Sequence, residues 1–142
     1  MGKVMTRIKL TNSVDAGNAR NGALPLERVR TLCLDALVDT GATLLALPED
    51  AVDRLGLRQL DWRKVRLADG GVREVALVGD LQIEILGRTM TCDALVIPMG
   101  ATPLIGQIQL EALDLIVDAK SREARVNPAS PDIPTLDLLS GG

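Results

Sequence analysis

Residues 37–42 read Leu37-Val38-Asp39-Thr40-Gly41-Ala42 and connect two apolar runs, residues 29–38 and residues 42–47. Short runs rich in Leu, Val and Ala beside a Gly-containing turn are typical of buried strands. The pattern therefore predicts a strand, a sharp turn and a second strand, with the carboxylate of Asp39 at the turn.

The composition predicts one mainly β domain. The chain has 142 residues, of which 46% are hydrophobic, and a net charge of −3, which is enough apolar material for a single core. One Trp and no Phe or Tyr leave an aliphatic core, and branched aliphatic residues favour strands. We expect the domain to cover residues 1–126. Prolines at 128, 131 and 134 preclude a regular central strand, so residues 127–142 are expected to be a tail that is flexible or lies in a dimer interface.

The residue types that are missing restrict the chemistry. The chain contains no histidine, which excludes Ser-His-Asp and Cys-His catalysis and the usual histidine-containing zinc sites. Cys33 and Cys92 are too few for a cysteine-rich metal site, and their apolar surroundings favour buried, reduced thiols over a disulfide. Neither Gly-rich phosphate-binding loop is present. We therefore expect no metal and no cofactor, so any chemistry must rest on carboxylates.

Charge and hydropathy argue against two classes of partner. A pI near 4.9 and a single aromatic residue supply neither the basic surface nor the stacking platforms that nucleic acids need. No window approaches the roughly 18 apolar residues of a membrane span, and residues 1–7 lack the apolar stretch of a signal peptide. We expect a cytoplasmic protein that binds neither nucleic acid nor membrane.

The rest of the chain reads mainly as strands and turns. Alternation predicts a first strand at residues 6–10, and the turn-rich residues 12–25 are expected to form a loop. Short helices are predicted at residues 48–56, which end in Gly56, and at residues 107–113. The remaining predictions are a hairpin turning at Ala68-Asp69-Gly70-Gly71, a second hairpin from residues 78–86 and 90–97, and closing strands at residues 115–117 and 123–126.

The order of these features matches a known family. The Asp39-Thr40-Gly41 turn comes first, the Gly-tipped hairpin follows, and Leu104-Ile105-Gly106 then precedes a short helix. Over about residues 6–126 this set resembles the retropepsin-like aspartic proteases, the family of the retroviral proteases and their bacterial and cellular relatives. The resemblance implies a mainly β, single-domain closed β-barrel, the acid protease fold, with one or two short helices and completed as a homodimer.

The resemblance also implies roles for particular residues. Asp39 would be the catalytic residue, Thr40 would brace the two subunits, and Gly41 and Ala42 would support the site and let the substrate backbone approach. The hairpin residues Ala68, Asp69, Gly70 and Gly71 fall where the substrate-binding flap should be, and Leu104, Ile105 and Gly106 would pack the site. Thr43 and Gln107 stand where the retroviral enzymes usually have an acid and an Arg, which indicates a rebuilt neutral contact.

The chemistry itself requires a second carboxylate, because aspartic protease hydrolysis uses two carboxyl groups that share one proton. Asp35 cannot be the partner, since four residues of strand span about 13 Å. No second Asp-Thr-Gly or Asp-Ser-Gly is present, so the partner is expected to be Asp39 of a second copy.

The sequence therefore predicts an aspartic endopeptidase that cleaves an extended peptide or protein substrate, with apolar pockets from neighbours such as Leu67 and Ile105. Ala42 lacks the hydroxyl that often hydrogen-bonds this carboxylate, which favours activity toward mildly acidic or neutral pH. The alternative is a dimerisation or peptide-binding module with weak catalysis or none.

Overall fold

The computed structural model describes residues 3–138, so residues 1–2 of the predicted domain and residues 139–142 of the predicted tail lie outside the described residues. Within this range the protein is mainly β, as predicted, with three short helices instead of one or two. The helices are α1 (Ser13–Arg20), α2 (Glu49–Leu55) and α3 (Gln107–Ala112), and a single 3-10 turn covers Leu26–Arg28. The strands are β1 (Met5–Asn12), β2 (Thr31–Val38), β3 (Leu45–Pro48), β4 (Arg58–Arg66), β5 (Val72–Ile85), β6 (Arg88–Ile97), β7 (Leu104–Ile105), β8 (Leu115–Asp118) and β9 (Glu123–Val126).

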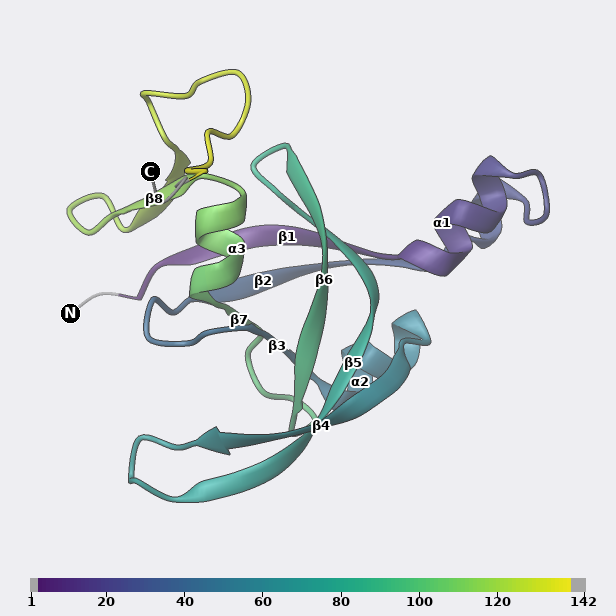
Figure 1. The fold of residues 1–142 in the computed structure, drawn as a ribbon, viewed down its shortest axis with the longest axis horizontal. Coiled ribbons are helices and arrows are strands. Elements are labelled where there is room, and N and C mark those ends of the chain that lie inside the picture. Colours follow the sequence, from purple (N-terminus) through teal and green to yellow (C-terminus); the bar gives the residue numbers. More distant parts are fainter. Residues whose placement is uncertain (1–2, 139–142) are drawn as a thin grey trace.

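The main sheet returns on itself. Its strand order is β1-β2-β7-β3-β6-β5-β4, and β1 also pairs with β5, so every strand of this sheet except β4 belongs to a ring. The hairpin of β4 and β5 projects from the ring. Helix α1 follows the C-terminal end of β1 and projects from the other side of the molecule (Figure 1). Strands β8 and β9 form a separate two-stranded sheet. This arrangement is consistent with the expected acid protease fold.

The core lies inside the ring and is aliphatic, as the composition predicts. Burying one such side chain contributes about 1.5–3 kcal/mol relative to leaving it exposed. Helix α2 closes one end, and Gly56 ends it in the left-handed conformation with a φ of 62°, which glycine adopts without strain. The largest fully buried aliphatic side chains are Ile8, Leu10, Leu45, Leu47, Leu55, Leu81, Ile83, Ile85, Ile105 and Leu113.

The predicted loop at residues 12–25 is wrong, because its first part forms α1. The side chain of Asn12 caps this helix by accepting a hydrogen bond from the amide of Asp15 at 3.0 Å, and it donates to the carbonyl of Leu55 at 2.9 Å. The carboxylate of Asp15 binds the guanidinium of Arg30 at 2.8 Å. The contacts with Leu55 and Arg30 come from other parts of the chain, so the local sequence pattern did not reveal the helix.

Both predicted hairpins are confirmed, and they share one long strand. Strand β5 pairs with β4 along its first half and with β6 along most of its length. The first hairpin turns at residues 67–71, and the second turns at Leu86 and Gly87. Because β5 belongs to both hairpins, the projecting hairpin is directly continuous with the ring.

The two cysteines are free thiols in different environments. Cys92 is partly buried, and burial, followed by the negative charge of Asp93, raises the pKa of its thiol to about 12. Cys33 is exposed, which corrects the expectation of a buried thiol. Along β2 the odd-numbered residues Thr31, Cys33 and Asp35 are exposed, because alternate side chains of a strand point to opposite faces.

The first part of the tail packs against the domain. The guanidinium of Arg88, at the start of β6, donates to the carbonyls of Leu113 and Asp114 at 3.0 and 3.1 Å and to the carbonyl of Ser130. The carboxylate of Asp114 accepts a hydrogen bond from the amide of Thr135 at 3.0 Å. Between residues 3 and 138, no helix is long and apolar enough to span a bilayer.

Candidate active site

Asp39 lies at a tight turn directly after β2. Its amide donates to the carbonyl of Ile105 at 3.0 Å, and its own carbonyl accepts from the amide of Ala42 at 3.1 Å. Its carboxylate accepts a hydrogen bond from the amide of Gly41 at 2.9 Å. The side chain is half-buried, so one carboxylate is held in a defined orientation and is still accessible.

Strand β7 supports this turn, because it lies between β2 and β3 in the sheet. Leu104 lies opposite Leu37 of β2 in a parallel pair and opposite Ala46 of β3 in an antiparallel pair. After β7, the amide of Gln107 donates to the carbonyl of Ala42 at 2.8 Å, and the amide of Ile108 donates to the carbonyl of Thr43 at 3.2 Å. The start of α3 is thereby fastened to the chain that leaves the Asp39 turn.

Gly106 allows the start of α3 to approach the backbone of Thr43 and Leu44 this closely. A Cβ atom at this position would lie 2.7 Å from the carbonyl carbon and oxygen of Thr43 and 2.8 Å from the carbonyl carbon of Leu44. Those atoms are backbone, so they cannot move aside as the end of a flexible side chain could. The structure thus brings Leu104, Ile105 and Gly106 against the turn that carries Asp39.

The predicted neutral contact between Thr43 and Gln107 takes a different form. The backbone bonds just described join the two segments, and the side-chain amide of Gln107 donates instead to the carboxylate of Glu111 at 3.1 Å. Glu111 lies one turn further along α3. The contact that replaces a charged pair is therefore made by peptide groups.

The side of the sheet that carries Asp39 follows from the strand register. Residues opposite each other on adjacent strands point to the same side, and side chains alternate along each strand. Leu104 is opposite both Leu37 and Ala46, Ala46 is opposite Leu95, and Leu95 is opposite Leu77. We call this surface the Asp39 face, and it comprises Leu37, Ala46, Leu77, Leu95 and Leu104.

The core confirms this division of the sheet into two sides. The sequence neighbours Ala36, Leu45, Val78, Ala94 and Ile105 all belong to the main core cluster, whereas on the Asp39 face Leu37, Leu95 and Leu104 are partly exposed and Ala46 and Leu77 are buried outside that cluster. Asp39 follows Leu37 by two positions in extended chain, so its side chain is on the same side. Ile105 is fully buried on the other side, which corrects the expectation that it forms a substrate pocket.

The predicted flap is the exposed hairpin of β4 and β5. At its tip, the amide of Leu67 donates to the carbonyl of Gly71 at 2.7 Å, and the carboxylate of Asp69 accepts from the amide of Gly71 at 2.7 Å. Gly70 has a φ of 87°, which favours glycine. Ala68 completes this exposed tip. In Figure 1 the hairpin and the turn after β2 extend to the same side of the molecule, and no hydrogen bond in the described part of the chain joins them.

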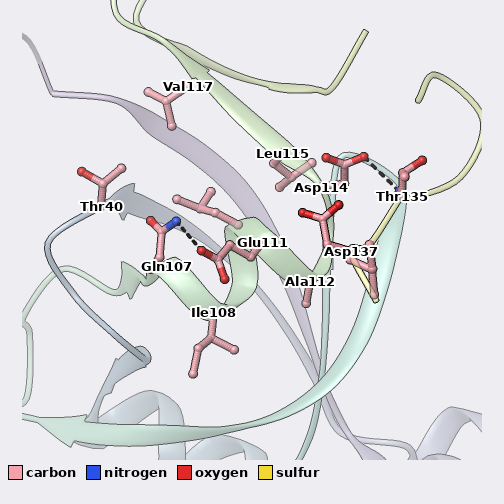
Figure 2. A pocket seen from close by; sticks show the side chains of 12 residues that line it. Thr40, Gln107, Ile108, Glu111, Ala112, Asp114, Leu115, Val117, Thr135 and Asp137 are labelled. Carbon is pink, nitrogen blue, oxygen red and sulfur yellow. Dashed lines mark hydrogen bonds between the residues drawn. The ribbon is translucent and has the colours of Figure 1, made fainter. Parts of the chain in front are cut away.

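Thr40 points away from the Asp39 face into a separate hollow of about 750 Å³. Figure 2 shows its side chain near Gln107, with Glu111 further along α3 and Thr135 of the tail across the hollow. Asp39 does not line it. No local pattern in the sequence indicates that tail residues 135–137 lie near the Asp39-Thr40-Gly41 segment. Thr135 is held there by hydrogen bonds with Asp114 and with Ser130, which in turn binds Arg88.

Asp35, the acid that precedes Asp39 in the chain, is already paired with a cation. Asp35 is exposed and pairs with Arg7 at 3.3 Å. Within residues 3–138, no group of three or more His, Cys, Asp or Glu side chains could hold a metal ion. Each described chain therefore offers a single suitably held carboxylate at the turn after β2.

Comparison with known proteins adds one positive finding. The family model described as Aspartyl protease matches residues 28–108. The matched region covers more than half of the chain and includes Asp39, the β4–β5 hairpin and Leu104-Ile105-Gly106. A search of curated proteins found no match.

Proposed function

The chain belongs to the aspartyl protease family, and from that premise we propose that it is an aspartic endopeptidase whose site is completed by a homodimer. Each subunit contributes Asp39, and the two carboxyl groups meet at the twofold axis. The single observation that carries the proposal is the turn after β2, where the amide of Gly41 holds one accessible carboxylate and the amide of Asp39 anchors the backbone to the carbonyl of Ile105.

The reaction needs both carboxyl groups in different protonation states. The ionised Asp39 removes a proton from a water molecule, while the protonated Asp39 of the other subunit donates a hydrogen bond to the peptide carbonyl and polarises it. The water oxygen bonds to the carbonyl carbon and forms a tetrahedral intermediate. Proton transfer to the amide nitrogen then breaks the carbon–nitrogen bond and releases an amine and a carboxylic acid.

The neighbouring residues would support this chemistry. Gly41 and Ala42 leave room for the substrate backbone, and Thr40 braces the two subunits. The tip at Ala68-Asp69-Gly70-Gly71 would close over the substrate and exclude water. The peptide would lie extended along the Asp39 face, whose partly exposed residues Leu37, Leu95 and Leu104 suit apolar substrate residues.

Two further expectations remain part of the proposal. The protease domain comprises residues 1–126, and residues 127–142 form a tail that is flexible or contributes to the dimer interface. The second reading of the tail is supported by its packing near Thr40, the residue assigned to the contact between subunits.

Comparison of three proteins on a random peptide library tests the proposal: the wild type, Asp39→Asn, and Asp35→Asn as the matched control. Asp35 lies in β2, four residues before Asp39, but is exposed and paired with Arg7. We expect the wild type and Asp35→Asn to cleave the same peptides and Asp39→Asn to cleave none. The oligomeric state of all three is measured alongside.

The outcomes separate the possible functions. Cleavage by a folded Asp39→Asn protein would remove Asp39 from the mechanism. If no variant cleaves and all are dimers that bind peptides, the protein is the peptide-binding module and the proposed activity is wrong.

A further inference from the structure

The Asp39 face continues from the ring onto the projecting hairpin, and there its character changes from apolar to basic. Leu77 of β5 is opposite Asp61 of β4, and the next pairs on the same side are Val75 with Arg63 and Arg73 with Val65. No irregularity interrupts the register between these pairs. Arg63 and Arg73 therefore point to the same side of the sheet as Asp39.

The two arginines differ in their partners. Arg63 is held by the carboxylate of Asp61 at 3.0 Å and by the carbonyl of Trp62 at 2.8 Å. Arg73 is exposed, and within residues 3–138 it makes no ion pair. The guanidinium of Arg73 is thus the cation on this side of the hairpin that no carboxylate neutralises.

Other acids on this side lie elsewhere. Asp93 of β6 packs beside Gly79, as a Cβ atom at Gly79 would lie 2.6 Å from its carboxylate. Along β5, Gly79 is further from the hairpin tip than Leu77 is. Asp93 is therefore remote from Arg73. Glu74 points to the opposite side of the hairpin, where it is opposite Lys64.

We propose that Arg73 selects peptides that carry an Asp or Glu side chain close to the bond that is cleaved. This inference rests on the proposed function, because it assumes that the hairpin closes over a peptide on the Asp39 face. Arg73 is two residues from Gly71 at the hairpin tip, which corresponds to about 7 Å of strand. An extended peptide below the hairpin has the same spacing, so the acidic residue is expected within about two residues of the cleaved bond.

The physical basis is a charge-assisted hydrogen bond. A guanidinium donates to a carboxylate through two parallel N–H groups, and such bonds are shorter and stronger than neutral ones. The closed hairpin excludes water from the pair and so strengthens it. Because part of the attraction acts through solvent, the preference should weaken as ionic strength rises.

Matched peptides that differ only in Glu against Gln near the cleaved bond test this selection. For the wild type we expect kcat/KM to be about tenfold higher for the Glu peptide, as a hydrogen bond between charged groups allows. Arg73→Gln should remove the preference, and Arg73→Glu should reverse it toward Lys peptides. Arg66→Gln is the matched control, because Arg66 is equally close to the tip but, opposite Val72, points to the other side of the hairpin.

The same peptides, fluorescently labelled, are also bound to Asp39→Asn, so that selection is measured without turnover. Equal binding and cleavage of Glu and Gln peptides by proteins that retain Arg73 would overturn the inference but leave the protease intact. A preference that Arg73→Gln keeps, or that Arg66→Gln loses, would also overturn it. Selective binding that depends on Arg73, with no cleavage by the wild type, would support the inference and contradict only the proposed activity.

Discussion

At the scale of single residues, the turn that carries Asp39 depends on the absence of a side chain at Gly106. Gly106→Ala would force a Cβ atom to within 2.7 Å of the backbone of Thr43. We expect the free energy of unfolding to fall by about 1–3 kcal/mol, the usual cost of overpacking. Peptide cleavage should fall more than the folded fraction does. The backbone that has to shift, at Thr43 and Leu44, directly follows the Asp39 turn in the chain.

Gly17→Ala is the control for this prediction. Gly17 lies within α1, where the nearest atom to an added Cβ is the end of the Arg20 side chain at 3.6 Å. Replacing this helical glycine should stabilise the protein by roughly 0.5–1 kcal/mol. Denaturant unfolding measures both variants, and a Gly106→Ala protein as stable and active as the wild type would contradict the role of Gly106.

At the scale of elements, local patterns predict what local interactions determine. The hairpin with its tip at Asp69-Gly70-Gly71 and the helix that ends at Gly56 were visible in the sequence, since alternation and glycine turns act over a few residues. Helix α1 was missed because its apolar periodicity is weak and Arg30 stabilises it from outside the helix. The apolar Asp39 face was missed because it depends on the register of β7 between β2 and β3, which joins residues far apart in the chain.

The pair of Asp15 and Arg30 gives a prediction about α1. The side-chain hydrogen bond from Arg30 is the main cause that holds the pKa of Asp15 below its ordinary value. Asp15→Asn should therefore lower the free energy of unfolding by about 1–2 kcal/mol at neutral pH. A carboxyl group whose pKa is lower in the folded state stabilises the protein above its unfolded pKa, and this contribution is lost as pH falls through the folded value.

Thermal or denaturant unfolding at several pH values measures this effect. The difference between wild type and Asp15→Asn should be full at neutral pH and should shrink in acid. Asp35→Asn serves as the control, because both side chains of its ion pair with Arg7 are 66% exposed and such pairs contribute little. A difference for Asp15→Asn that stays constant into strong acid would show that the carboxylate charge is not responsible.

At the scale of the whole molecule, the main core and the candidate active site lie on opposite sides of the ring. Its inner side holds the aliphatic core, while its outer side carries Asp39, the Asp39 face and the basic side of the hairpin. The described chain supplies one carboxylate there, and hydrolysis by this chemistry requires two. Asp35, in the strand that precedes Asp39, is bound to Arg7. Activity is therefore expected to belong to the assembly of two chains.

Mixed dimers test that conclusion directly. Wild-type and Asp39→Asn chains that carry different tags are unfolded together, refolded, and separated into the three kinds of dimer. If the chains of an equal mixture pair at random, about a quarter of the dimers have two wild-type chains, so the mixture should retain about a quarter of the wild-type activity. The purified mixed dimer, which has one Asp39, should be inactive although it is as stable as the parents. If activity instead fell in proportion to the wild-type fraction, and the mixed dimer kept half of it, each chain would carry a complete site of its own.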